Sequence, residues 1–189
     1  MSTSAWCRRR VRYSATATWV SNSLPTLEIR RLRADEGLAY RAVRLRALEL
    51  EPEAYGQTLA EALADPEQLW HDLAASVADE GNPRALFVLD RGDGTLGGTL
   101  YGAVSPTSPH FGSLGAMWVD ADLRSAGWAD ELMDAACGWA SRWGAPGVTL
   151  WLAPGNERAW RFYQRHGFQP TGNLAPAQVG EAMELYRDL

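Results

Sequence analysis

Cysteine and histidine are scarce in this chain of 189 residues, which has two cysteines and three histidines. Because these residues do not cluster at metal-ligand spacing, no metal site is expected. Cys7 lies in a polar tail and Cys137 in a predicted helix. No disulfide is therefore expected, which favours a reduced, cytoplasmic setting. Cys137 has no histidine near it in the sequence, and a small buried hydrophobic residue is a better interpretation than a nucleophile.

Basic residues are fewer than acidic residues. The 18 Lys and Arg residues face 23 Asp and Glu residues, which gives a formal net charge of -5 at pH 7. Because nucleic-acid binding needs a basic surface, no nucleic-acid partner is expected. The negative balance suits a cationic or amine substrate only weakly, and solubility alone explains it. With 46% hydrophobic and 22% charged residues, the composition is typical of a globular protein with a core of its own.

A long apolar run is missing near the start of the chain. Arginines 8, 9, 10 and 12 include the pair expected in a twin-arginine signal, but no apolar stretch of sufficient length follows before Pro25. Residues 1–26 are therefore predicted to be a flexible N-terminal extension, or an upstream addition from a misplaced start codon. Residues 27–189 are predicted to form a single domain, and no membrane partner is expected.

Apolar alternation and turn signals divide this domain into strands and helices. Strands are predicted at 27–32, 84–89, 95–104, 111–119 and 148–153, with two more after residue 167, and helices at 35–51, 65–77, 124–143 and 156–167. The loop 90–94 is rich in Asp and Gly and joins two strands as a hairpin. This order of elements predicts a mixed sheet covered by helices.

The most informative stretch is 117–129, which is predicted to be the end of a buried strand, a turn and a helix start. Backbone N–H groups at a helix start are unpaired and favour anions, so phosphate can bind there without a lysine. Gly127 has no side chain and its neighbours are small, which lets a phosphate approach the backbone. Arg124 adds a charge that can reach the phosphates or hold the loop in shape. The stretch therefore predicts a pyrophosphate site.

Other glycine-rich phosphate motifs fit less well. The P-loop pattern Gly-x-x-x-x-Gly-Lys-Ser/Thr is not present, and Gly-x-Gly-x-x-Gly does not follow a strand as a dinucleotide-binding fold requires. What is present is Arg124-x-x-Gly127-x-Ala129, which resembles motif A of the GNAT superfamily of acyl-CoA-dependent N-acetyltransferases. A second block, 156–168, is similar to that superfamily's Asn-x-x-Ala-x-x-Phe-Tyr-x-x-x-Gly-Phe signature.

The resemblance implies a fold, a cofactor and a set of site residues. The fold is an α/β fold of the α+β type, with a mixed, mostly antiparallel twisted sheet of about seven strands flanked by about four helices. The implied cofactor is acetyl-CoA, and the implied reaction moves its acetyl group to a primary amine by direct attack. The cofactor-binding residues that it implies are Met117, Trp118, Val119, Arg124, Ser125, Ala126, Gly127, Trp128, Ala129, Asn156, Ala159 and Tyr163.

Within this set, the last three residues share one helix face because they are three and four positions apart. The resemblance implies that Asn156 bonds the pantetheine arm and that Tyr163, near the thioester sulfur, is the general acid. A phenol with a pKa of about 10 is a suitable donor to a leaving thiolate. A helix cap at Asn156 and a boundary aromatic at Tyr163 are the simpler interpretations of the same residues.

The sequence departs from the superfamily pattern in two places. Gly115 stands where many members have a strand glutamate, so the group that deprotonates the amine is open, with His110, Asp120 and Glu61 as candidates. Ser125, Ala126 and Trp128 replace the usual residues of the phosphate loop, and Trp128 is expected to pack under the helix or to cover the cofactor. A catalytically inactive acyl-CoA-binding sensor or interaction module is therefore the alternative.

The acceptor is not specified by any motif. It is a small-molecule or peptide amine, and an aromatic acceptor cleft formed by Trp118, Tyr55 and Trp151 is one hypothesis, with core packing as the other. Homodimerisation through edge strands is a further option.

Overall fold

A single mixed sheet of seven strands forms the centre of the computed structural model, which describes residues 26–105 and 108–189. Almost all of the predicted extension 1–26, including Cys7, lies outside the described residues. The strands lie in the order β1-β2-β3-β4-β5-β7-β6. Their bounds are β1 Glu28–Arg31, β2 Arg84–Asp90, β3 Leu96–Ser105, β4 Ser108–Val119, β5 Gly147–Leu152, β6 Gln169–Pro176 and β7 Glu181–Asp188. The pair β4–β5 is parallel, and the other described pairs are antiparallel.

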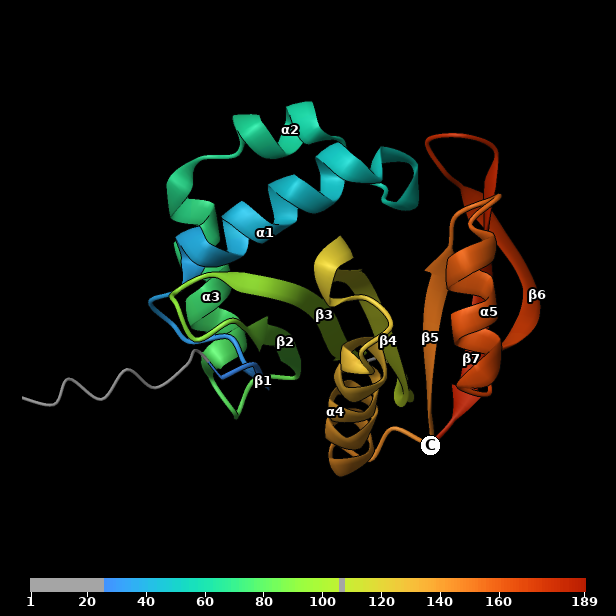
Figure 1. Ribbon diagram of the computed structural model, residues 1–189. Helices are drawn as coiled ribbons and strands as arrows, with labels where there is room; N and C mark the ends of the chain where they lie inside the picture. Colours follow the sequence, from blue (N-terminus) through green and yellow to red (C-terminus); the bar gives the residue numbers. More distant parts are fainter. Residues whose placement is uncertain (1–25, 106–107) are drawn as a thin grey trace, which may run out of the picture.

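Helices flank both faces of the sheet (Figure 1). They are α1 Gly37–Leu50, α2 Leu59–Ala64, α3 Glu67–Ala78, α4 Trp128–Arg142 and α5 Glu157–Arg165, with short 3-10 turns at Pro52–Ala54 and Ala121–Leu123. The predicted fold class is confirmed, but the described part of the chain has five α-helices where about four were predicted. The additional helix is α2. It begins with a capping box in which Thr58 and Glu61 bond each other's backbone N–H groups.

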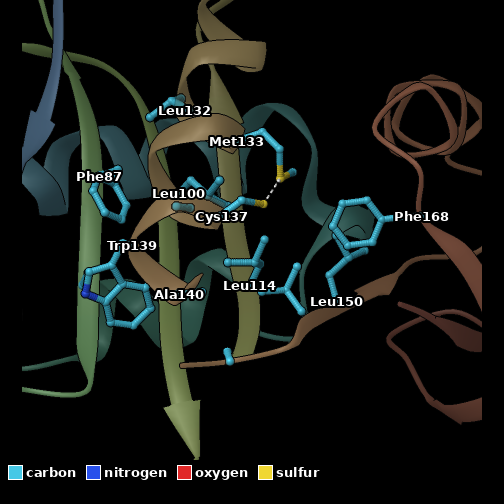
Figure 2. Packing of buried hydrophobic residues seen from close by; sticks show 14 of the residues in the cluster. Phe87, Leu100, Leu114, Leu132, Met133, Cys137, Trp139, Ala140, Leu150 and Phe168 are labelled. Atoms are coloured by element: carbon cyan, nitrogen blue, oxygen red, sulfur yellow. Dashed lines mark hydrogen bonds between the residues drawn. The ribbon is translucent and has the colours of Figure 1, made fainter. Parts of the chain in front are cut away.

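The sheet separates two parts of the core, and the side chains of the buried strand β2 contribute to both. Alternate residues of β2 point to opposite faces of the sheet. Phe87 and Leu89 pack with Leu132, Met133 and other residues of α4, whereas Leu86 and Val88 pack with α1 and α3. Figure 2 shows the α4 side of this core, where Cys137 lies inside and its sulfur is 3.7 Å from that of Met133. Cys137 is therefore a small buried residue, as predicted.

In the described part of the chain, no helix is both long and apolar enough to cross a membrane.

Candidate active site

The two central strands separate shortly after they meet. β4 and β5 pair only through Phe111–Gly147, Gly112–Val148 and Ser113–Thr149. Beyond these pairs, residues 114–119 of β4 and 150–153 border a cleft of about 510 Å³. The edge of β4 that faces this cleft has no strand partner among the described residues. The carbonyl oxygens of Met117 and Val119 accept hydrogen bonds from side chains, which leaves the backbone N–H groups of this edge for a ligand.

A bulge bends β4 where the cleft begins. The register with β3 shifts between Thr99–Trp118 and Tyr101–Gly115, so Ala116 and Met117 lie opposite one residue of β3. Ala116 has a φ of 51°, which is rare for a residue with a side chain. The hydroxyl of Thr99 donates to the carbonyl oxygen of Ala116 at 2.8 Å and holds the bulge. Because a bulge bends its strand, β4 is directed away from β5 at this point.

The start of α4 opens into one end of the cleft. Gly127 is the N-cap residue, with φ 89°, in the left-handed region that favours glycine. A Cβ atom added there would meet nothing within 4 Å, so the space beside this backbone is open. Ser125 also has a positive φ of 66°. With its unpaired N–H groups beside an open space, this helix start is suited to an anion.

Arg124 is occupied by contacts within the protein. Its Nε donates to the carbonyl oxygen of Val119 at 2.8 Å, and its guanidinium lies 4.7 Å from the centre of the Trp118 ring. Its Nη2 is 3.2 Å from a carboxylate oxygen of Glu51. Of the two roles predicted for Arg124, the structure supports holding the loop in shape.

Glu51 also forms an ion pair with Arg158, so one carboxylate holds two arginines that line the cleft. This carboxylate follows the end of α1, and Arg158 lies in the first turn of α5. The sequence analysis missed Glu51, because the two partners are 107 residues apart and no local pattern relates them.

Tyr163 lies beside β4, in the middle of the cleft. Its hydroxyl is 3.7 Å from the sulfur of Met117, and its ring packs edge-on against Phe162 and Phe168. Burial raises the pKa of Tyr163 to about 12. The hydroxyl therefore keeps its proton at neutral pH and can act as a donor.

Two further residues, Tyr55 and Asn156, line the same cleft as Tyr163. The hydroxyl of Tyr55 donates to the carbonyl oxygen of Met117 at 3.0 Å, and burial raises the pKa of Tyr55 above its ordinary value. Asn156 caps α5, since its side-chain oxygen accepts from the backbone N–H of Ala159 at 3.0 Å. The simpler interpretation of Asn156 as a helix cap is thus confirmed, and the residue also lines the cleft.

The structure brings ten of the twelve predicted site residues to the cleft wall. These are Met117, Trp118, Val119, Arg124, Ser125, Gly127, Ala129, Asn156, Ala159 and Tyr163. Ala126 and Trp128 are not among the lining residues. Trp128 packs against the core on the α4 side, because the first turn of α4 directs it toward the sheet. Trp118 is buried, whereas Trp151 is 48% exposed.

The residues predicted as candidate bases are Asp120, Glu61 and His110, and the structure assigns no free carboxylate to Asp120. Asp120 accepts from Nη2 of Arg46 and Nη2 of Arg91, each at 3.0 Å, and from the indole N–H of Trp118. Burial alone would raise the pKa of Asp120, but these hydrogen bonds outweigh it and hold the pKa below its ordinary value. A carboxylate held in this way is a poor proton acceptor, so Asp120 is corrected to a structural role.

Glu61 also has a structural role, since it is held by the Thr58 cap and does not line the cleft. The side chain of His110 lies outside the described residues. The carboxylates that do line the cleft are Glu51, bound to two arginines, and Asp130, which is 2.9 Å from Nε2 of His166. No group of three potential metal ligands occurs within 26–105 and 108–189.

Replacing Asp120 with asparagine is expected to lower the free energy of unfolding by about 2 kcal/mol at pH 7, because two arginines lose a partly buried carboxylate partner. Since the folded-state pKa is depressed, this stabilisation is present above the pKa of an unfolded aspartate, about 3.9, and is lost as the pH falls through the lower folded value. Urea titrations of both proteins at pH 7 and at about pH 3 measure the difference.

The matched control is Asp122→Asn, which removes an exposed partner of Arg91 and should lower the free energy of unfolding clearly less than Asp120→Asn does. An equal loss in the two variants, or a loss for Asp120→Asn that does not shrink with falling pH, would contradict this account.

Comparison with known proteins agrees with the geometry. A family profile described as "Acetyltransferase (GNAT) family" matches residues 44–168. Among curated proteins, none matches the chain.

Solved structures of similar fold include three acetyltransferases. A GNAT-family acetyltransferase from Streptococcus pneumoniae has a TM-score of 0.73 at 16% identity, with 87% of this chain and 99% of that chain covered. YncA of Salmonella typhimurium, solved with its cofactor acetyl-CoA, has a TM-score of 0.69 at 15% identity, with 87% and 94% covered. A GCN5-related N-acetyltransferase from Kribbella flavida has a TM-score of 0.68 at 19% identity, with 86% and 98% covered. At these identities the likeness establishes the fold alone.

Proposed function

Since the chain belongs to the GNAT acetyltransferase family, we propose that it transfers the acetyl group of acetyl-CoA to a primary amine of a small molecule or peptide. The observation that carries this proposal is the cleft between β4 and β5. It joins an open helix start at Gly127 to the protonated hydroxyl of Tyr163.

The cofactor would lie along the cleft. Its pyrophosphate would bind the backbone N–H groups at the start of α4, where Gly127 leaves room. Its pantetheine arm would bond the unpartnered edge of β4 at 117–119 and pass Asn156 and Ala159 of α5. The acetyl-CoA in the structure of YncA, a protein of the same fold, supports this choice of cofactor.

The reaction would proceed by direct attack. The neutral amine forms a bond to the thioester carbon, the carbonyl becomes an oxyanion, and the carbon–sulfur bond then breaks. Backbone N–H groups of β4 near Val119 would stabilise the oxyanion. The thiol of coenzyme A, with a pKa of about 8.5, leaves with the proton that Tyr163 donates. The amine nitrogen loses its proton to solvent, and solvent returns a proton to the phenolate of Tyr163.

No unpaired carboxylate among the described cleft residues is placed to take the proton from an alkylammonium acceptor. The acceptor amine, with a pKa near 10, would therefore lose its proton before it binds, and the rate would rise with pH up to about 10. The same observation favours the second candidate function, an acyl-CoA-binding protein without transferase activity.

Calorimetric titration with acetyl-CoA, followed by a thiol-release assay with a panel of amines, tests the proposal. Binding together with thiol release that depends on an amine supports the transferase. Binding without release by any amine would leave the sensor function. Failure to bind acetyl-CoA would overturn both.

A further inference from the structure

We propose that Trp151 and Glu184 form a subsite for a cationic group of the acceptor, and that the preferred acceptor is an amine with a second positive charge. This inference rests on the proposed function. Trp151 lines the cleft, and Glu184 is its partner on the neighbouring strand β7.

The two side chains lie on the same face of the sheet. Val148, Leu150 and Leu152 of β5 are buried in the α4 core, so the residues between them point to the opposite face. Trp151 is 48% exposed there. Directly paired residues of antiparallel strands have Cβ atoms about 5 Å apart, so the side chains of Trp151 and Glu184 leave the same face of the sheet as neighbours.

Two neutral side chains of β6 orient this carboxylate. Its Oε2 accepts from the hydroxyl of Thr171 at 2.9 Å and from the amide nitrogen of Asn173 at 2.7 Å. The other oxygen, Oε1, has no donor among the described residues. No Arg or His of the described chain pairs with Glu184, in contrast to the cleft carboxylates Glu51 and Asp130. Glu184 therefore has no cationic partner among the described residues and offers a free acceptor oxygen one strand away from Trp151 of the cleft wall.

An indole face and a carboxylate together are suited to an ammonium or guanidinium group, since both attract a cation and the carboxylate also accepts its hydrogen bonds. The subsite is one strand away from β5, about 4.8 Å in the sheet. A flexible spacer of several methylene groups between the two amines of an acceptor would let one amine react in the cleft while the other binds at the subsite.

The turn between β6 and β7 reaches the same region. Gln178 donates to the carbonyl oxygen of Tyr55 at 2.8 Å, so this turn contacts the segment between α1 and α2. The contact places Tyr55, which touches Met117 in the cleft, on the same side as the proposed subsite. An acceptor held by Trp151 and Glu184 would therefore extend toward the sulfur end of the cofactor.

Thiol release with three amines of similar length tests the subsite: 1,4-diaminobutane, butylamine and 4-aminobutyrate. For the unchanged protein we expect kcat/KM to be at least about tenfold higher for diaminobutane than for butylamine, and lowest for aminobutyrate. Glu184→Gln should lower kcat/KM for diaminobutane about tenfold, through KM, and leave butylamine and acetyl-CoA binding unchanged. Trp151→Leu should also reduce the preference for the diamine.

The matched control is Glu181→Gln, which removes one exposed charge from the same strand and should change neither amine. Equal kcat/KM for diaminobutane and butylamine, or an equal fall for both in Glu184→Gln, would overturn the subsite and leave the transferase intact.

If no amine releases thiol, the proposed function fails, and calorimetric titration of diaminobutane into the protein then decides the subsite alone. Binding that Glu184→Gln removes would support it, and no binding would overturn it.

Discussion

Replacing Tyr163 with phenylalanine is expected to lower kcat about 100-fold while the dissociation constant of acetyl-CoA changes less than about twofold. The hydroxyl of Tyr163 lines the cleft, and with a pKa of about 12 it is protonated at every pH of a normal assay. Phenylalanine keeps the ring contacts with Phe162 and Phe168, so the fold should be unchanged. Steady-state thiol release and calorimetry measure the two quantities.

Tyr55→Phe provides the matched control, because it removes the other hydroxyl that contacts Met117. Loss of its hydrogen bond should cost about 1 kcal/mol of stability and only a small part of the turnover. The assignment of Tyr163 as general acid would be abandoned if Tyr163→Phe kept the full rate, or if the two variants lost it equally.

Replacing Gly127 with tryptophan is expected to weaken acetyl-CoA binding at least 100-fold, about 2.8 kcal/mol. The indole would fill the open space at the start of α4, where the phosphates are proposed to bind. A side chain at φ 89° also adds about 1–2 kcal/mol of backbone strain. Calorimetry measures the binding, and circular dichroism with thermal unfolding measures the strain.

Gly144→Trp separates the two effects. Gly144 follows the other end of α4, has φ 79°, and also faces open space. Because the two glycines are 17 positions apart along α4 and its caps, the two sites are about 25 Å apart. We expect the same loss of stability and unchanged binding. If both substitutions weakened binding alike, the phosphate site at Gly127 would be refuted.

Local patterns predicted most of the fold. The apolar run of β2, the Asp- and Gly-rich loop of the hairpin and the small residues before α4 each mark an element that the structure contains. The helix α2 was missed because it spans six residues, too few for a periodic pattern, although its Thr58–Glu61 capping box was visible in the sequence.

The candidate site was predictable only where its residues are close in the chain. Gly127 and Tyr163 belong to contiguous blocks, and the structure places both at the cleft. Glu51 and Arg158 meet from distant segments, and Asp120 is bound by Arg46 and Arg91 of two other elements. Such contacts depend on the tertiary fold, so the sequence indicated a free carboxylate at Asp120 where the structure contains partly buried ion pairs.

Only three residue pairs join β4 to β5, so the backbone ladder between the block β1–β4 and the block β5–β7 is short, while both blocks share the core on the α4 side. Within each block, long backbone ladders fix the strands. Across the open end, the described contacts include side-chain pairs such as Glu51–Arg158 and Asp130–His166, which are partly exposed to solvent. Salt screens such pairs but leaves backbone ladders almost unaffected. These ion pairs are therefore the contacts across the open end that ionic strength weakens, whereas the apolar core that the two blocks share is not screened.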